Sequence, residues 1–241
     1  MSTIWIIAKR ELNAFFDSLL AYILIIVFLA FTGFFTWFFG SDVFLVNQAS
    51  LQSFFGVAYW TLFIVIPALT MKLIAEERNS GTIELILTKP VSDWQFVVGK
   101  FMAALILIIF TLALTLPYYI TVAFIGPIDH GATICGYLGL ILMSAVYISI
   151  GIFASSITTN QIVSFLIALL IGIFFHLLFG ILANSFPGFF GNILDYISLT
   201  THFESISRGV IDTKDLIYFF SIIALGLFGA EVVLSKRNLS D

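Results

Sequence analysis

The chain has 241 residues, of which 61% are hydrophobic and only 10% are charged, and its formal net charge is −4. Its mean hydropathy is +1.12. A soluble domain has about 25% charged residues, so this chain has too little polar surface to cover a globule in water. The sequence also has no basic stretch suited to a nucleic-acid partner. The composition therefore predicts an all-α integral membrane protein with lipid as its main solvent.

The N-terminal segment, residues 1–17, mixes large apolar side chains with charged ones. Trp5, Ile6 and Phe16 flank the charged triplet Lys9-Arg10-Glu11. Such mixing is typical of a short amphipathic helix that lies in the membrane interface instead of crossing it. We therefore expect an interfacial helix before the first span.

Six apolar segments follow, each long enough to cross a bilayer core that needs roughly 20 helical residues. The predicted spans are Leu19–Gly40, Phe54–Met71, Phe101–Phe124, Cys135–Ala154, Ile162–Ala183 and Leu216–Leu234. Pro67 and Pro117 fall inside two of them, where each is expected to kink its helix. The single cysteine, Cys135, excludes an internal disulfide and is interpreted as a small core residue.

The first span carries a stripe of four phenylalanines, Phe28, Phe31, Phe35 and Phe38. Spacings of three and four residues place these side chains on one face of a helix. Helix packing or lipid contact is the usual meaning of such a stripe. The alternative is an apolar path for a lipid-like substrate.

The distribution of basic residues predicts the orientation. With the N-terminus inside, eight of the ten lysines and arginines are cytoplasmic, and only Arg208 and Lys214 lie outside. This satisfies the positive-inside rule. We expect a multi-pass protein of the bacterial inner membrane, with both termini and Glu84 in the cytoplasm and with Asp42, Asp129 and Glu204 outside.

The exterior stretch 184–215 is too apolar for a free loop. It contains Phe186, Phe189 and Phe190, but Pro187 and Gly188 interrupt it. We expect short, partly re-entrant helices that dip into the outer leaflet and pack against the bundle. No internal repeat is visible, so residues 1–241 are predicted to form a single transmembrane domain.

The sequence has no phosphate-binding loop of the type Gly-x-x-x-x-Gly-Lys-Ser/Thr, since its single Gly-Lys pair, Gly99-Lys100, is followed by Phe101. It also lacks a His-Glu-x-x-His zinc helix and a Gly-x-Ser-x-Gly elbow. We therefore expect no catalytic, cofactor-binding or metal-binding residue in this chain. If ATP drives it, the ATP is bound by a separate polypeptide.

Two titratable residues lie within the predicted spans, and such residues are often functional. Glu231 is close enough to the end of its span to reach the inner interface. His176, deep in the fifth span, can form one hydrogen bond between helices when neutral. An ion-coupled secondary carrier would show several intramembrane carboxylates, and an intramembrane enzyme would show paired groups at one depth. Both classes remain as alternatives.

The hydrophilic link 72–100 between the second and third spans carries a strong pattern. Ser80 or Thr82 can cap the start of a helix, Glu84 is favourable in its first turn, and Lys89-Pro90 ends it. The apolar face of this predicted helix consists of Ile83, Ile86 and Leu87. Such a helix either lies on lipid head groups or seats in a cytosolic partner.

Residues 76–92 resemble the coupling-helix region of ABC-2 type permeases, which also lies between the second and third spans. The matching residues are Glu76-Glu77-Arg78, Ser80-Gly81-Thr82-Ile83-Glu84-Leu85 and Thr88-Lys89-Pro90-Val91-Ser92. The residues that the resemblance implies for ATPase coupling are Glu76, Glu77, Gly81, Thr82, Ile83, Glu84, Leu85, Ile86, Leu87, Thr88 and Pro90.

A second resemblance precedes the last span, in the subgroup of this family that includes copper-maturation and gliding-motility permeases. Its residues are Tyr196-Ile197-Ser198, His202-Phe203, Arg208-Gly209-Val210-Ile211-Asp212, Asp215-Leu216 and Tyr218-Phe219. Overall similarity is greatest to the gliding-motility permeases of Bacteroidota. The resemblance implies a cytosolic ABC ATPase dimer as partner, a second permease copy or related membrane subunit, and spans two and five lining the route between the two permeases.

Overall fold

The computed structural model describes residues 2–38, 49–82, 91–186 and 188–236. These residues form helices, turns and short connections, without a strand among them. Six helical segments are long and apolar enough to cross a membrane, which confirms the predicted all-α architecture. They are Leu19–Trp37, Gln52–Asn79, Asp93–Ile125, His130–Ile157, Gln161–Ser185 and Thr213–Ser235.

Helix α1 (Thr3–Asp17) precedes the first span, α2 (Leu19–Trp37). The second span consists of α4 (Gln52–Thr70) and α5 (Ala75–Asn79), and the third of α7 (Asp93–Ala113) and α8 (Leu116–Ile125). The fourth span is α9 (His130–Ile157). The fifth consists of α10 (Gln161–Ile173), the π-helix η1 (Phe174–Leu178) and α11 (Phe179–Ser185). Two short helices, α12 (Phe189–Ile197) and α13 (Leu199–Ser207), lead to the sixth span, α14 (Thr213–Ser235).

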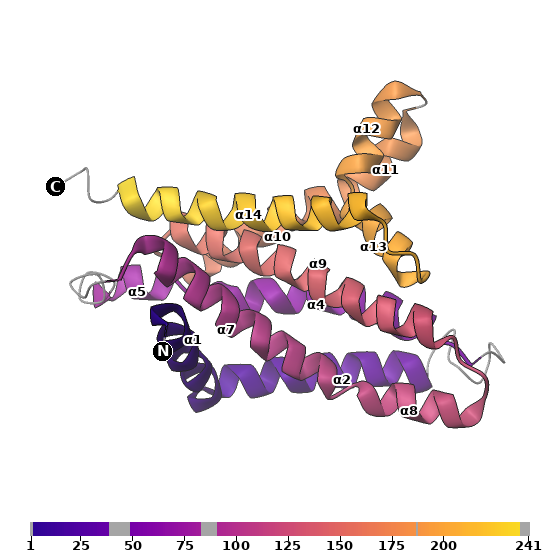
Figure 1. Cartoon of the computed structure of the whole chain (residues 1–241). Helices are drawn as coiled ribbons and strands as arrows, with labels where there is room; N and C mark the ends of the chain where they lie inside the picture. The colour runs from indigo at the N-terminus through magenta and orange to yellow at the C-terminus, as the bar shows by residue number, and fades with distance from the viewer. Residues whose placement is uncertain (1, 39–48, 83–90, 187, 237–241) are drawn as a thin grey trace.

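Helix α9 is the centre of the bundle, with α4, α7, α10, α13 and α14 packed around it (Figure 1). Small residues allow this close packing. An added Cβ at Gly136 would lie 2.4 Å from the Phe55 ring, and one at Gly151 would lie 2.0 Å from Thr70 Oγ1. In lipid, helices associate through such close van der Waals contacts, because apolar burial gives little net drive.

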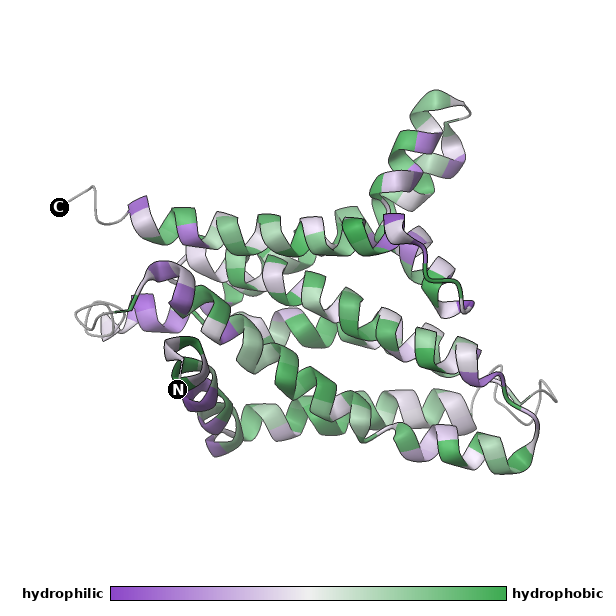
Figure 2. Ribbon diagram, in the orientation of Figure 1, coloured by the Kyte–Doolittle hydropathy of each residue, from purple (hydrophilic) through white to green (hydrophobic). Residues whose placement is uncertain are grey.

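Both chain termini lie at the same end of the bundle, together with α1 and α5, as an even number of spans requires (Figure 1). We call this the termini end and the opposite end the far end. Apolar residues cover the length of the bundle helices, and hydrophilic residues concentrate on α1, α5 and the far-end connections (Figure 2). This is the distribution expected of a bundle that lipid surrounds at its middle.

Two of the spans are interrupted near their prolines. Pro67 lies inside α4, which gives way to a turn after Thr70 before α5 begins. The third span was expected to be one kinked helix, but a turn at Leu114–Thr115 divides it, and Pro117 lies at the start of α8. Proline lacks the N–H that continues a helix ladder and is tolerated at a helix start.

The predicted hydrophilic link of residues 72–100 is much shorter in the structure. Helix α5 extends the second span to Asn79, and α7 begins at Asp93 behind a capping box formed by Ser92 and Gln95. Lys100 is therefore two turns inside a helix and is only 1% exposed. The predicted end of the second span and the predicted start of the third span were therefore wrong. Charged residues that pair with one another can extend a helix beyond its apolar run.

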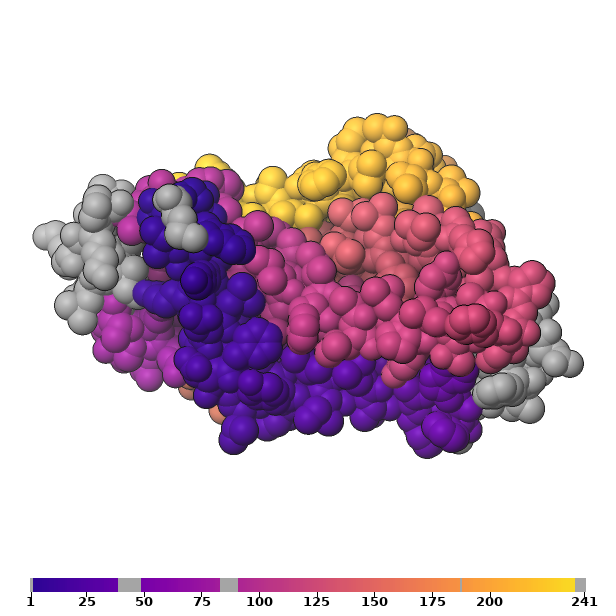
Figure 3. Space-filling model, turned by 60° about the horizontal axis from the view of Figure 1, so that its bottom comes forward, coloured from indigo at the N-terminus to yellow at the C-terminus, as the bar shows by residue number. Residues whose placement is uncertain are grey.

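The predicted interfacial helix is present as α1. It lies across α7 at the termini end, beside α2 (Figure 3). Its Ile7, Ala8 and Phe15 are buried against the bundle. Gly99 of α7 makes room for this contact, since an added Cβ there would lie 2.7 Å from Ile7 Cγ2. Helix α1 is therefore docked on protein as well as amphipathic.

The stretch 184–215 contains the short helices that were expected, but only one of them packs on the bundle. Helix α13 packs against α9, whereas α12 pairs with α11 as a hairpin that stands away from the other helices (Figure 1). Phe189 and Phe190 at the start of α12 are largely exposed. The expectation that both short helices pack on the bundle was wrong for α12.

Candidate coupling site and far-end cavity

The break between α4 and α5 is held by a serine of the central helix. Ser155 of α9 accepts hydrogen bonds from the backbone N–H groups of Ile74 (3.0 Å) and Ala75 (2.9 Å). The same hydroxyl donates to the carbonyl of Met71 at 3.0 Å. One side chain thus satisfies three backbone groups that the interrupted helix leaves free. Arg78 adds a hydrogen bond to the carbonyl of Ser156.

Four charged side chains from three elements form a network beside this break. Lys100 of α7 pairs with Glu77 of α5 at 3.0 Å and with Glu11 of α1 at 3.2 Å. Arg10 of α1 pairs with the same two carboxylates, Glu11 at 2.6 Å and Glu77 at 3.1 Å. Two cations and two anions therefore tie α1, α5 and α7 together.

The network compensates for burial at Glu11, whereas burial still raises the pKa of Glu77 above its ordinary value. The Nζ atom of Lys100 lies 4.8 Å from the centre of the Phe96 ring, so the ammonium is covered by an aromatic face on one side and by carboxylates on another. Burial raises the pKa of Glu11, but the charges of Lys100 and Arg10 outweigh it and lower that pKa below its ordinary value. Glu11 is therefore held ionised, as a buried pair requires.

Helix α5 ends at the start of the predicted coupling helix. Ser80 donates to the carbonyl of Glu76 at 2.9 Å, and Gly81 has a φ of +69°, a left-handed conformation that suits glycine after a helix end. Ser80 thus closes the end of α5. Thr82 is the last described residue before the gap. The remaining predicted coupling residues, Ile83, Glu84, Leu85, Ile86, Leu87, Thr88 and Pro90, lie outside the described residues.

Of the predicted coupling residues, Glu76, Glu77 and Thr82 line a cavity of about 610 Å³ at the termini end, whereas Gly81 does not. Among the described residues, six charged ones line it, in equal numbers of each sign: Arg10, Lys72, Lys100, Glu11, Glu76 and Glu77. A surface with balanced charges is suited to a protein partner that contributes charges of its own.

The second motif, before the last span, folds into a compact polar cluster at the far end. His202 Nδ1 lies 2.7 Å from Asp215 Oδ1, and His202 Nε2 lies 3.0 Å from the carbonyl of Tyr196. The Tyr218 ring stacks on the imidazole at 4.0 Å, and its hydroxyl donates to the carbonyl of Ile197. These contacts tie α12 and α13 to α14.

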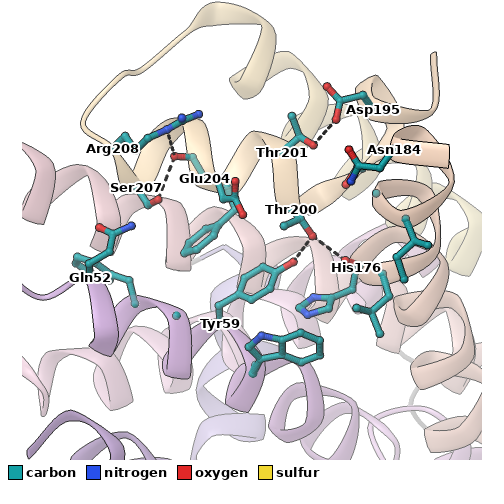
Figure 4. A pocket seen from close by; sticks show the side chains of 18 residues that line it. Gln52, Tyr59, His176, Asn184, Asp195, Thr200, Thr201, Glu204, Ser207 and Arg208 are labelled. Carbon is teal, nitrogen blue, oxygen red and sulfur yellow. Dashed lines mark hydrogen bonds between the residues drawn. The ribbon is translucent and has the colours of Figure 1, made fainter. Parts of the chain in front are cut away.

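Beside this cluster lies a cavity of about 750 Å³, between the second span, the fifth span and α13 (Figure 4). Gln52, Tyr59 and Trp60 contribute from α4, and His176 from η1. The rim carries Asn184, Asp195, Thr201, Glu204 and Arg208. Spans two and five were predicted to line a route between permeases, and both contribute walls to this cavity.

His176 is the residue that joins the walls of this cavity. Its ring stacks between Tyr59 (4.1 Å between ring centres) and Phe63 (4.6 Å), and Tyr59 stacks in turn on Phe203 of α13. Its Nδ1 is hydrogen-bonded to the hydroxyl of Tyr147 on α9, so the expected bond between helices is present. The backbone carbonyl of His176 accepts from Thr200 Oγ1 at 2.7 Å. The π-helix thus fixes contacts to three neighbouring elements.

Sequence reasoning missed several of these residues. It placed Lys100 in a hydrophilic link, gave Ser155 no role, and treated His202 and Asp215 only as part of a resemblance. The sequence did contain a signal for the start of α7, because Ser92-x-x-Gln95 is a capping-box pattern and places the first helical residue at Asp93. No comparable local signal marks the partners of Lys100 or Ser155.

The geometry defines a class of protein first, namely a six-span α-helical membrane protein with a braced segment between spans two and three. A family model described as ABC-2 family transporter protein matches residues 40–234. The chain therefore belongs to the ABC-2 transporter family and is a membrane subunit of an ABC transporter. The match begins after α2 and includes the other five spans. No curated protein matches the chain.

Proposed function

We propose that this chain is a permease subunit that couples ATP hydrolysis by a separate cytosolic ABC ATPase dimer to movement of its membrane helices. The observation that carries the proposal is the bracing of α5, which directly precedes the predicted coupling helix. Ser155 holds α5 to α9, and the Glu77–Lys100 pair holds it to α7. A force on residues 80–92 is thereby passed to three spans.

The termini end is the cytoplasmic side in this proposal. The apolar face of Ile83, Ile86 and Leu87 seats in the ATPase, while the charged cavity beside α5 faces the same partner. A second permease, identical or related, completes the transporter, since two ATPase subunits need two docking sites. The complex resides in the bacterial inner membrane, where ATP is bound by the partner.

We further propose that the work is export or mechanical work at the cell envelope, in gliding motility. The support is the overall similarity of the sequence to gliding-motility permeases of Bacteroidota, since the motif before the last span resembles a subgroup that also includes copper-maturation permeases. The structure gives this motif a physical role, because His202, Asp215 and Tyr218 hold the far-end helices together.

The experiment that tests coupling is the substitution Ile86→Asp in the chain co-expressed with its ATPase. Burying an aliphatic side chain contributes about 1.5–3 kcal/mol, and a carboxylate in its place is costly to desolvate. The variant should insert at wild-type levels and retain less than a tenth of the ATPase on affinity purification, as about 1.4 kcal/mol is tenfold in affinity.

The matched control is Leu85→Asp, the same chemical change on the opposite side of the predicted helix. It should weaken ATPase retention less than Ile86→Asp does. Equal retention by the wild type and both variants would show that this helix rests on lipid or on its own bundle, and the coupling proposal would then fail.

A further inference from the structure

Two residues in the wall of the far-end cavity each have a buried polar atom without a hydrogen-bond partner among the described residues. The two atoms are His176 Nε2 and Ser198 Oγ. His176 is 2% exposed and Ser198 is fully buried. Buried polar groups are nearly always paired, and an unpaired one costs about 1–3 kcal/mol. Their presence together points to a polar ligand group within the cavity.

The rim of the cavity favours a ligand with a positive group. Asp195 and Glu204 are exposed there and form no ion pair with any described residue. Arg208 is the single cation in the lining. Glu204 extends from α13 to the side of the cavity where Tyr59 and Thr200 lie (Figure 4). Two carboxylates and one guanidinium complement a head that combines an ammonium with a phosphate.

An apolar groove adjoins the polar cavity. It has a volume of about 410 Å³ and lies between the outer half of α2 and α4. Phe31 and Phe35, from the stripe of the first span, line it together with Val57 and Ile64. Gly56 and Trp60 line both the groove and the polar cavity, so the two spaces meet at these residues. The site as a whole is therefore amphiphilic.

From this arrangement we infer that the joined spaces bind one phospholipid with an ammonium-bearing head of the phosphoethanolamine type. The head lies in the cavity, where Glu204 and Asp195 take the ammonium and Arg208 and His176 Nε2 take the phosphate oxygens. One acyl chain passes Gly56 and lies along Phe31 and Phe35. This site is independent of ATPase docking, so it is tested without the partner.

Trp60 provides a probe at the junction of the two spaces. A variant that keeps Trp60 and replaces Trp5, Trp37 and Trp94 by Phe is reconstituted in vesicles that contain a brominated phosphatidylethanolamine or a brominated phosphatidylglycerol. Bromine quenches tryptophan fluorescence on contact. The amine lipid should quench at about two- to fivefold lower mole fraction, the range that an exposed ion pair gives.

Two substitutions separate the site from general lipid contact. Gly56→Leu fills the junction, since an added Cβ at Gly56 meets open space and the helix is not disturbed. Glu204→Gln removes the carboxylate. Each should abolish the preference for the amine lipid. The controls are Ala123→Leu, at an exposed position of α8, and Asp17→Asn, at an exposed position of α1, and neither should change it.

Equal quenching by the two lipids in the wild type would mean contact with bulk lipid only and would overturn the inference. A preference that persists in Gly56→Leu would likewise overturn it, since the head and chain would then not share this site. Either result would leave the proposed coupling function untouched, because no ATPase is present in the assay.

Discussion

At the scale of single residues, this protein depends on a few polar side chains in an apolar bundle. Lys100, Ser155 and His202 are each buried and each satisfy groups on other helices. In a low-dielectric interior such groups are strong when paired and costly when one partner is removed. Their substitution should therefore have larger effects than those of the many apolar residues that face lipid.

Ser155→Ala should destabilise the protein by about 1–3 kcal/mol, because the freed backbone groups at Met71, Ile74 and Ala75 lose their partner. Thermal unfolding in detergent measures the effect. Ser221→Ala is the matched control, since Ser221 is exposed and its hydroxyl bonds only within its own helix. A shift no larger than that of the control would show that Ser155 does not hold the break.

Lys100→Met should destabilise the protein by about 3–5 kcal/mol, the usual effect of leaving buried charges without a partner. Lys214→Met is the control, because Lys214 is more than half exposed in its pair with Asp212. The double variant Lys100→Met, Glu77→Gln should recover part of the loss. If both lysine variants melt alike, the network contributes no more than a surface ion pair does.

At the scale of elements, α1 is an example of a helix whose place is decided by charge as well as by an apolar face. Ile7 nests against Gly99, while Arg10 and Glu11 pair with Glu77 and Lys100. The contact between Ile7 and Gly99 lets α1 pack closely on α7, and the ion pair of Arg10 with Glu77 connects α1 to α5 as well. Loss of the charges should therefore loosen α1 without unfolding the bundle.

The ion pairs of α1 give a pH dependence with a definite sign. Since the pKa of Glu11 is lowered in the folded protein, its carboxylate contributes stability above its unfolded pKa of about 4.3, and this is lost as pH falls through the folded value. The difference in melting temperature between wild type and Glu11→Gln should be largest at neutral pH and should shrink below about pH 4. A difference that grows on acidification would contradict the assignment.

The two interrupted spans also depend on polar contacts with a neighbouring helix. Pro117 explains why α7 stops before α8, whereas Pro67 lies inside α4 and the break before α5 comes after Thr70. Neither proline explains what satisfies the helix ends at the breaks. Ser155 satisfies them at the first break. At the second break, Thr115 donates to the carbonyl of Leu112 and is hydrogen-bonded to the hydroxyl of Tyr137 on α9. A neighbouring helix supplies a partner at both breaks.

At the scale of the whole molecule, α5, which precedes the proposed coupling helix, lies at one end, and the far-end cavity, where we propose a lipid site, lies at the other (Figure 1). Helix α9 contacts elements of both sites, α5 at the termini end and α13 at the far end. A rigid central helix can carry motion between them, and we expect displacement of α5 to reach the cavity through α9.

The orientation is tested by cysteine accessibility in a Cys135→Ser background. Glu84→Cys should be labelled only after cells are opened, whereas Asp129→Cys and Glu204→Cys should be labelled by an impermeant reagent in intact cells. The expectation rests on eight of ten basic residues lying on one side. Labelling of position 84 from outside would reverse the topology and remove the basis for ATPase docking.

The sequence by itself determined the number of spans, their positions to within a few residues at most ends, and the family. The spans follow from local quantities, because apolar runs are read along the chain, whereas the family was indicated by the resemblance of two motifs to ABC-2 permeases. Only the tertiary structure decided that Lys100 is buried, that Ser155 holds the break before α5, and that α12 stands away from the bundle. These outcomes depend on partners far apart in sequence, such as Arg10 with Glu77 across 67 residues and Ile74 with Ser155 across 81. A helix pattern specifies which residues share a face, but which polar groups meet is decided when the helices pack, since each buried group must then find a partner.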